Sequence, residues 1–229
     1  MLVSRSALTA SSALALCVAG GVAATASAAP RIAATSPCVP NLGLAGARTL
    51  PFAGTGFTPN AVVTIRATSR SDPTPRELTS VRADAAGNVV GRVEPPALRS
   101  QRTMQQTFAL VALETTNPVN TATSTFRQVR FGFDVVPASG RPDRPVRYTA
   151  RGFVPGRAVY AHFRHGGVTR RSVRLGVARS PCGIVSRRMA LLPTKSRFGT
   201  WLVYMDQSRR FSRRTLLQAR GSLVIRAGG

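Results

Sequence analysis

Hydrophobic and polar side chains alternate in short segments along most of the chain. Alternation with a period of two is typical of β-strands that bury one face and expose the other. The alternating segments span residues 62–68, 89–93, 108–113, 144–153, 159–164 and 201–204. Turn-forming residues separate them, and the 16 prolines and 20 glycines are scattered too evenly for long helices. The pattern therefore predicts an all-β protein.

Two stretches of the chain repeat each other in sequence. Residues 48–60, RTLPFAGTGFTPN, align with residues 144–156, RPVRYTARGFVPG, at an offset of 96 positions. The matched positions are Gly56, Phe57 and Pro59 with Gly152, Phe153 and Pro155, then Gly87 with Gly183 at the same offset, and residues 107–111 with 200–204 at an offset of 93. Three blocks in one order with nearly one spacing indicate a duplicated unit of about 95 residues.

Each repeat has the length and the turn spacing of an immunoglobulin-like domain, which has seven strands in two packed sheets. We expect Phe57 and Phe153 to lie between the sheets, with the following Pro-Asn or Pro-Gly pair turning the chain. The sequence therefore predicts two tandem immunoglobulin-like Greek-key β-sandwiches. Domain 1 is expected over residues 29–135 and domain 2, which is rich in arginine, over residues 136–229.

The repeat pattern resembles the secreted Ig-like domains of actinobacterial exported and surface proteins. Its order is a strand, Gly-Phe-x-Pro-Gly, a strand, Asp-x-x-Gly, a strand and a late aromatic strand. The first repeat is also distantly similar to the neocarzinostatin-type apoprotein sandwich, through residues 54–59 and 79–87. The second resemblance implies a small-molecule carrier with a cleft in domain 1. Those proteins pair cysteines within one sandwich, and this sequence has no such pairs.

The start of the chain has the pattern of an export signal. Arg5 precedes an apolar stretch over residues 7–24, and Ala26-Ser27-Ala28 matches the small-x-small motif that a signal peptidase accepts. We therefore expect residues 1–28 to be a signal peptide and the mature protein to be secreted or associated with the cell surface. A retained membrane anchor is the alternative. No later segment is long and apolar enough to span a bilayer.

Two cysteines, Cys38 and Cys182, remain after the expected cleavage. An even pair in an exported protein usually forms a disulfide. The repeat places Ala86 opposite Cys182 and gives Cys38 no counterpart, so a bond between them would join the two domains. Free thiols and an intermolecular bond are the alternatives.

Catalytic and metal-binding patterns are weak in this sequence. His162 and His165 lie on a predicted strand and turn, and they lack the further ligands that a zinc site needs. There is no Gly-x-Ser-x-Gly nucleophile motif, and the eight acids suggest no catalytic pair. We therefore expect a protein that is not an enzyme and that has no cofactor, no metal and no catalytic residues.

Positive charge is the strongest functional signal. The chain carries a net charge of +24, and residues 141–229 hold 19 arginines and Lys195 against two acids. A surface of this kind attracts polyanions. The candidate polyanion-binding residues are Arg170, Arg171, Arg174, Arg187, Arg188, Arg209, Arg210, Arg213 and Arg214. We expect an anionic cell-envelope polymer as the partner, without specific nucleic-acid recognition; a freely secreted structural protein with no dedicated ligand is the alternative.

Overall fold

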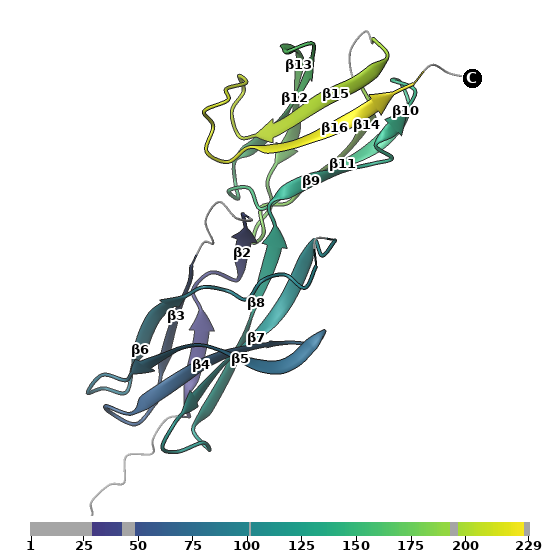
Figure 1. Cartoon of the computed structure of the whole chain (residues 1–229). Coiled ribbons are helices and arrows are strands. Elements are labelled where there is room, and N and C mark those ends of the chain that lie inside the picture. The colour runs from purple at the N-terminus through teal and green to yellow at the C-terminus, as the bar shows by residue number, and fades with distance from the viewer. Residues whose placement is uncertain (1–28, 43–48, 101, 193–196, 227–229) are drawn as a thin grey trace, which may run out of the picture.

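The computed structural model describes residues 29–42, 49–100, 102–192 and 197–226. Within these ranges the chain forms two β-sandwiches, one after the other along a long axis (Figure 1). The described residues contain no helix that could cross a membrane. The predicted signal peptide, residues 1–28, lies outside the described part of the chain. The prediction of an all-β protein built from sandwiches is confirmed.

The first sandwich has a three-stranded and a five-stranded sheet. The smaller sheet has the order β1 (Arg31–Ala34), β3 (Leu50–Thr55), β6 (Val89–Val93). The larger has the order β2 (Cys38–Asn41), β8 (Thr121–Arg130), β7 (Gln105–Glu114), β4 (Val62–Ser69), β5 (Asp72–Arg82). Neighbouring strands are antiparallel except β2 and β8, which are parallel.

The second sandwich repeats this topology. Its smaller sheet has the order β9 (Gly132–Val136), β11 (Pro145–Arg151), β14 (Val185–Ala190). Its larger sheet has the order β10 (Ser139–Gly140), β16 (Ala219–Ile225), β15 (Gly199–Asp206), β12 (Ala158–His165), β13 (Val168–Val177). The first strand of each sandwich is divided between the two sheets, which gives eight strand segments where the sequence predicted seven strands.

The border between the sandwiches lies earlier than the sequence predicted. Strand β9 pairs with β11 of the second sandwich, from Gly132 opposite Arg151 to Val136 opposite Arg147. A division after residue 135 would cut through this strand. Strand β8 runs almost directly into β9, and no Pro-Gly turn between them marks the border.

Each sandwich has its own hydrophobic core. Leu50, Phe52 and Phe126 are among the fully buried residues of the first core, and Phe163 and Trp201 are among those of the second. Five of the six alternating segments lie wholly on strands, namely β4, β6, β7, β12 and β15, and the segment 144–153 contains β11. Burial of alternate side chains in these strands supplies the main driving force for folding.

The repeated glycines and phenylalanines make the same contacts in both sandwiches. The N–H of Phe57 donates to the carbonyl of Gly87 at 3.1 Å, and the N–H of Phe153 donates to that of Gly183 at 3.3 Å. Both glycines have positive φ, 77° and 61°. A Cβ atom at either position would overlap the carbonyl oxygen of the paired phenylalanine. The repeat therefore marks a turn that packs against the phenylalanine just after β3 or β11, and only glycine fits in this turn.

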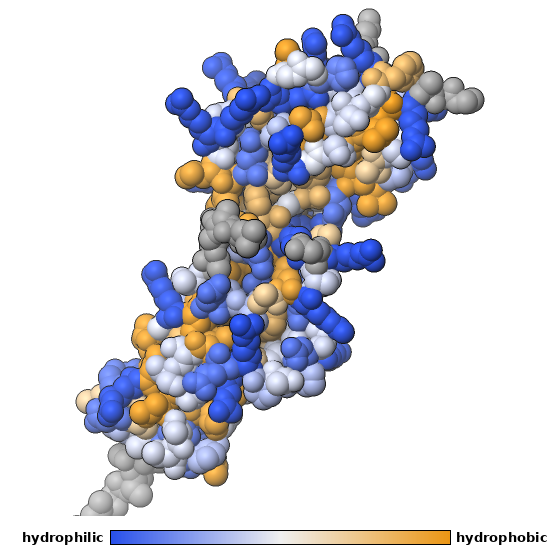
Figure 2. All heavy atoms as spheres, viewed as in Figure 1, coloured by the Kyte–Doolittle hydropathy of each residue, from blue (hydrophilic) through white to orange (hydrophobic). Residues whose placement is uncertain are grey.

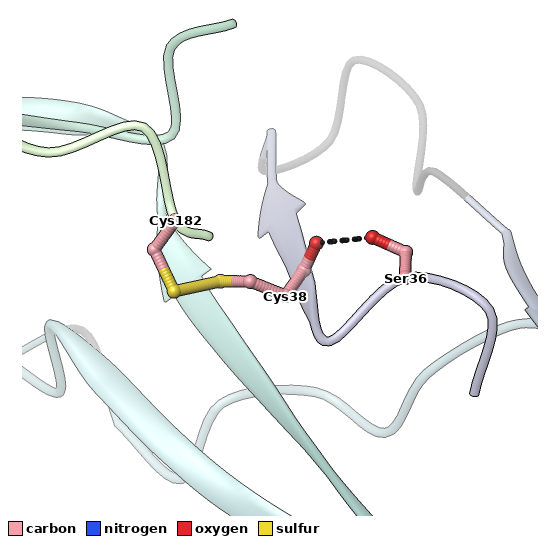
Figure 3. The surroundings of a disulfide bond; sticks show 3 residues. All are labelled: Ser36, Cys38 and Cys182. Atoms are coloured by element: carbon pink, nitrogen blue, oxygen red, sulfur yellow. Dashed lines mark hydrogen bonds between the residues drawn. A yellow bond between two sulfur atoms is a disulfide. The ribbon is translucent and has the colours of Figure 1, made fainter. Parts of the chain in front are cut away.

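The junction between the sandwiches has a covalent and a packed component. Cys38 of β2 and Cys182 of the second sandwich form a disulfide, and their Cα atoms are 5.2 Å apart (Figure 3). Val129 is buried with the two cysteines. Nearby, the ring of Phe131 packs against Phe153, with centroids 5.0 Å apart. The predicted bond between the domains is thus present, and Phe131, between β8 and β9, packs on the core of the second sandwich beside it.

Candidate functional site: the cationic surface of the second sandwich

Five of the nine candidate arginines lie on two neighbouring edge strands, and we call them the edge group. Strand β13 ends the five-stranded sheet, β14 ends the three-stranded sheet, and the two strands contact each other. The edge group consists of Arg170, Arg171 and Arg174 on β13 and Arg187 and Arg188 on β14, and all five are exposed. Arg187 bridges the strands, because its guanidinium donates to the carbonyl of Arg174.

The edge group extends onto the outer face of the smaller sheet. Arg188 lies directly opposite Arg147 in the pairing of β14 with β11, and both are exposed. Like charges at directly opposed positions of a sheet are destabilising. A bound anionic group between the two guanidinium groups would relieve this repulsion.

The other four candidate arginines lie between β15 and β16, and we call them the loop group. Arg209, Arg210, Arg213 and Arg214 are all exposed in this connection. Phe211 lies among them and holds the connection against the outer face of the five-stranded sheet. Its ring centroid lies 5.0 Å from that of Tyr204 and 5.7 Å from that of His162, and the Arg164 guanidinium lies 4.2 Å from it.

A buried His–Asp pair, which the sequence pattern did not predict, anchors this connection. His162 Nε2 lies 3.1 Å from Asp206 Oδ1, and neither residue is exposed. The same carboxylate accepts the N–H of Ser208 at 2.8 Å and the amide of Gln218 at 2.9 Å. Asp206 therefore binds both ends of the segment that carries the loop group.

The hydrogen bonds of Asp206 keep its carboxylate charged. Burial alone would raise the pKa of this carboxyl, but the bonds from His162, Ser208 and Gln218 outweigh burial and lower the pKa below its usual value. His162 also contacts Ser172, with Nδ1 and Oγ 2.7 Å apart. Serine, histidine and aspartate are the residue types of a nucleophilic relay, but here the imidazole is fully buried.

The strand pattern gave little indication of this pair. His162 alternates with Ala161 and Phe163, which belong to the core, so its side chain points to the outer face of the sheet. Side chains on an outer face are normally exposed to solvent. Here the segment that contains Phe211 covers the His162 side chain. By the repeat offsets, His162 and Asp206 correspond to Arg66 and Leu113. The pair is therefore particular to the second sandwich.

The acids of the second sandwich are already engaged. Asp134 pairs with Arg151, Asp143 pairs with Arg141 at 3.3 Å, and Asp206 pairs with His162. Within the described residues, none of the nine candidate arginines forms an ion pair with an acid. Their charge is therefore uncompensated by the protein.

The two groups of arginines occupy different parts of the second sandwich. The edge group lies along the side of the sandwich where the edge strands β13 and β14 contact each other. The loop group lies over the sheet face that contains His162. Ser172 lies on β13 between Arg171 and Arg174 of the edge group, and it contacts His162 beneath the loop group. Figure 2 shows hydrophilic side chains projecting widely from the second sandwich.

The histidines have structural contacts. His165 stacks on the buried ring of Trp201, with centroids 4.8 Å apart, and His162 is occupied by Asp206 and Ser172. In the described ranges, no three residues among His, Cys, Asp and Glu come together as a metal site.

Comparison with known proteins gives loose likenesses. No family model matches the sequence, and no curated protein matches it. Among solved structures, a tetra-tandem repeat in the extending region of a large adhesion protein is similar at 12% identity and a TM-score of 0.29, over 87% of this chain and 49% of that chain. The E. coli chaperone DraB is similar at 12% identity and a TM-score of 0.32, over 84% and 96%. The chain spans about half of the adhesion-repeat structure, and such likenesses concern the all-β architecture alone.

Proposed function

We propose that this is an exported, non-catalytic protein that attaches to an anionic polymer of the cell envelope through its second sandwich. The observation that carries the proposal is the set of nine exposed arginines without an acidic partner among the described residues. The three acids of this sandwich, by contrast, are all paired or buried.

The chemistry of arginine supports a polymer with carboxylate or phosphate groups. A guanidinium is planar and always charged, and it binds either group with two parallel hydrogen bonds. The edge group and the loop group lie on a strand edge and a sheet face. Extended surfaces of this kind suit a chain of repeating anions.

The disulfide supports a location outside the cytoplasm, because such bonds persist in oxidising compartments. The first sandwich carries less charge, with 11 arginines against five acids over residues 29–131. In this proposal it is a spacer, and the second sandwich makes the contact.

Fractionation of the producing cells tests the proposal. The protein should sediment with the envelope at low salt and elute as salt rises to and above physiological levels, because ions screen charge contacts. Retention that does not change with salt would exclude an electrostatic attachment. Complete recovery in the culture medium at low salt would favour the freely secreted alternative.

A further inference from the structure

A cleft lies at the junction of the two sandwiches, beside the disulfide. Its volume is about 360 Å³, within the range of small-molecule sites. The lining includes Cys182 and an arginine from each sandwich, Arg127 of β8 and Arg179 of the segment between β13 and β14. None of the nine candidate arginines lines this cleft, although its walls on β13 and β14 lie next in sequence to Arg174 and Arg187 of the edge group.

The floor and the rim of the cleft differ in chemistry. Leu175 and Val185 line it and are almost completely buried, with exposed fractions of 5% and 6%. Arg127, Arg179 and Ser186 also line it and are exposed. The cleft therefore offers an apolar surface below two cationic groups and a hydroxyl.

The charge at the rim has no acidic counterpart. No acid is among the described residues that line the cleft, and neither Arg127 nor Arg179 forms an ion pair within the described ranges. Two guanidinium groups around one small cleft favour a carboxylate or a phosphate monoester, which each can bind with paired hydrogen bonds.

The local structure holds both arginines in place. Arg179 exchanges backbone hydrogen bonds with Ile184, of 2.8 and 3.1 Å, and this closes the turn that contains Cys182. The N–H of Arg127 donates to the carbonyl of Pro37, next to Cys38, at 2.9 Å. The disulfide links these two backbone segments, so it brings the two halves of the cleft together.

We propose that the junction cleft binds a small organic anion with an apolar body, whose charged group contacts Arg127 and Arg179 jointly. The site requires both sandwiches, since each contributes one of the two arginines. Reduction of the disulfide therefore weakens it.

Phenyl phosphate is a suitable probe, and calorimetric titration of the mature, oxidised protein is the experiment. We expect saturable binding at one site, with R127Q and R179Q each weakening the affinity about tenfold or more. R76Q removes an exposed arginine of β5, away from the cleft, and should leave the affinity unchanged. Inorganic phosphate should bind more weakly, because it does not use the apolar floor.

Three outcomes would overturn the proposal: absence of saturable binding, equal losses in R127Q and R76Q, or equal affinity for phenyl phosphate and inorganic phosphate. A C38S/C182S variant that binds as the oxidised protein does would contradict the role of the disulfide. Salt elution of R127Q/R179Q from cell envelopes separates the two proposals, because that behaviour should match the wild type.

Discussion

Cys38 and Cys182 are 144 positions apart in the chain, yet their disulfide places the Cα atoms at 5.2 Å. One cysteine lies in each sandwich, so the bond acts on the junction and not inside either core. In antibody domains the conserved disulfide joins the two sheets of one sandwich. Here the disulfide joins two different sandwiches covalently.

Removal of this bond should lower stability without removing the sheets. The C38S/C182S variant is expected to lose roughly 2–4 kcal/mol in the free energy of unfolding, because the long loop is no longer closed in the unfolded chain. Its far-ultraviolet circular dichroism should stay that of a β-protein. Urea titration measures the change, and equal midpoints for the oxidised protein and the variant would contradict the expectation.

Gly87, the glycine of the repeated turn in the first sandwich, should tolerate no side chain. G87A introduces both an unfavourable φ and an overlap with the Phe57 carbonyl, and it should cost about 3 kcal/mol or more. Gly156 is the matched control, since its φ of 80° is similar and nothing lies within 4 Å of its Cβ position. G156A should therefore cost only about 1 kcal/mol. Thermal unfolding of both variants would show whether the overlap, beyond the φ angle, makes this glycine necessary.

Glu114 and Gln207 take the same role in the two sandwiches, and this makes E114Q informative. Glu114 accepts the N–H of Thr58 at 3.2 Å, and Gln207 accepts that of Val154 at 3.1 Å. A glutamine at position 114 can keep this bond, so E114Q should cost about 1 kcal/mol or less. E114A removes a buried acceptor shared by Thr58, Thr116 and Asn120 and should cost about 2–3 kcal/mol. Equal losses for the two variants in urea titration would contradict the equivalence.

The buried carboxylate of Asp206 should make stability fall in acid. Burial would raise its pKa, but the hydrogen bonds outweigh this and lower it below 3.8, so the folded state holds the charged form more strongly than the unfolded state does. The contribution is therefore present above the unfolded pKa and disappears as pH falls through the lower folded pKa. D206N should cost about 3 kcal/mol at neutral pH, and the difference from wild type should shrink below about pH 4.

Asp143 provides the control for that measurement. Its pair with Arg141 is exposed, with side-chain exposures of 69% and 66%, so D143N should change stability very little at any pH. A constant difference between D206N and wild type from neutral pH down to about pH 2 would show that the charge of Asp206 is not what stabilises the fold.

Ser172 should be unreactive toward serine-hydrolase probes. His162 is fully buried between Ser172 and Asp206, where it cannot pass a proton to a leaving group of a bound substrate. We expect mass spectrometry to find no adduct on Ser172 after treatment with a fluorophosphonate. An adduct that forms in the native protein and is lost in H162A would contradict the proposal of a non-catalytic protein.

The sequence predicted the elements whose alternation is clear. Strands β7 and β11 alternate between core and surface, and the repeated glycines marked equivalent turns. A disulfide between Cys38 and Cys182 was expected from an even pair of cysteines, and the repeat indicated that it would join the two domains, with free thiols and an intermolecular bond as the alternatives. These features are local, or they follow from the alignment of one repeat with the other.

Edge strands and tertiary burial were harder to predict. Strand β5 contains Pro73 and Pro75 and is largely exposed, while β13 is rich in arginine, so neither shows a clear hydrophobic alternation. Both are edge strands, where exposed and charged side chains are tolerated. His162 and Asp206 are contacted by Phe211, Ser208 and Gln218 of the connection between β15 and β16, which no strand pattern reports.

The central claim is that the second sandwich, and not net charge alone, binds anionic polymer. The test compares two variants of equal charge in binding to long-chain polyphosphate at several salt concentrations. One variant replaces the five edge-group arginines with glutamine. The other replaces five exposed arginines of the first sandwich, namely Arg70, Arg76, Arg92, Arg99 and Arg102.

The logarithm of the binding constant should fall linearly with the logarithm of salt concentration for the wild type, because bound cations are released from the polymer. We predict that the edge-group variant loses several units of this slope and most of its affinity, while the first-sandwich variant keeps both. Equal losses in the two variants, or wild-type binding that salt does not weaken, would contradict the account.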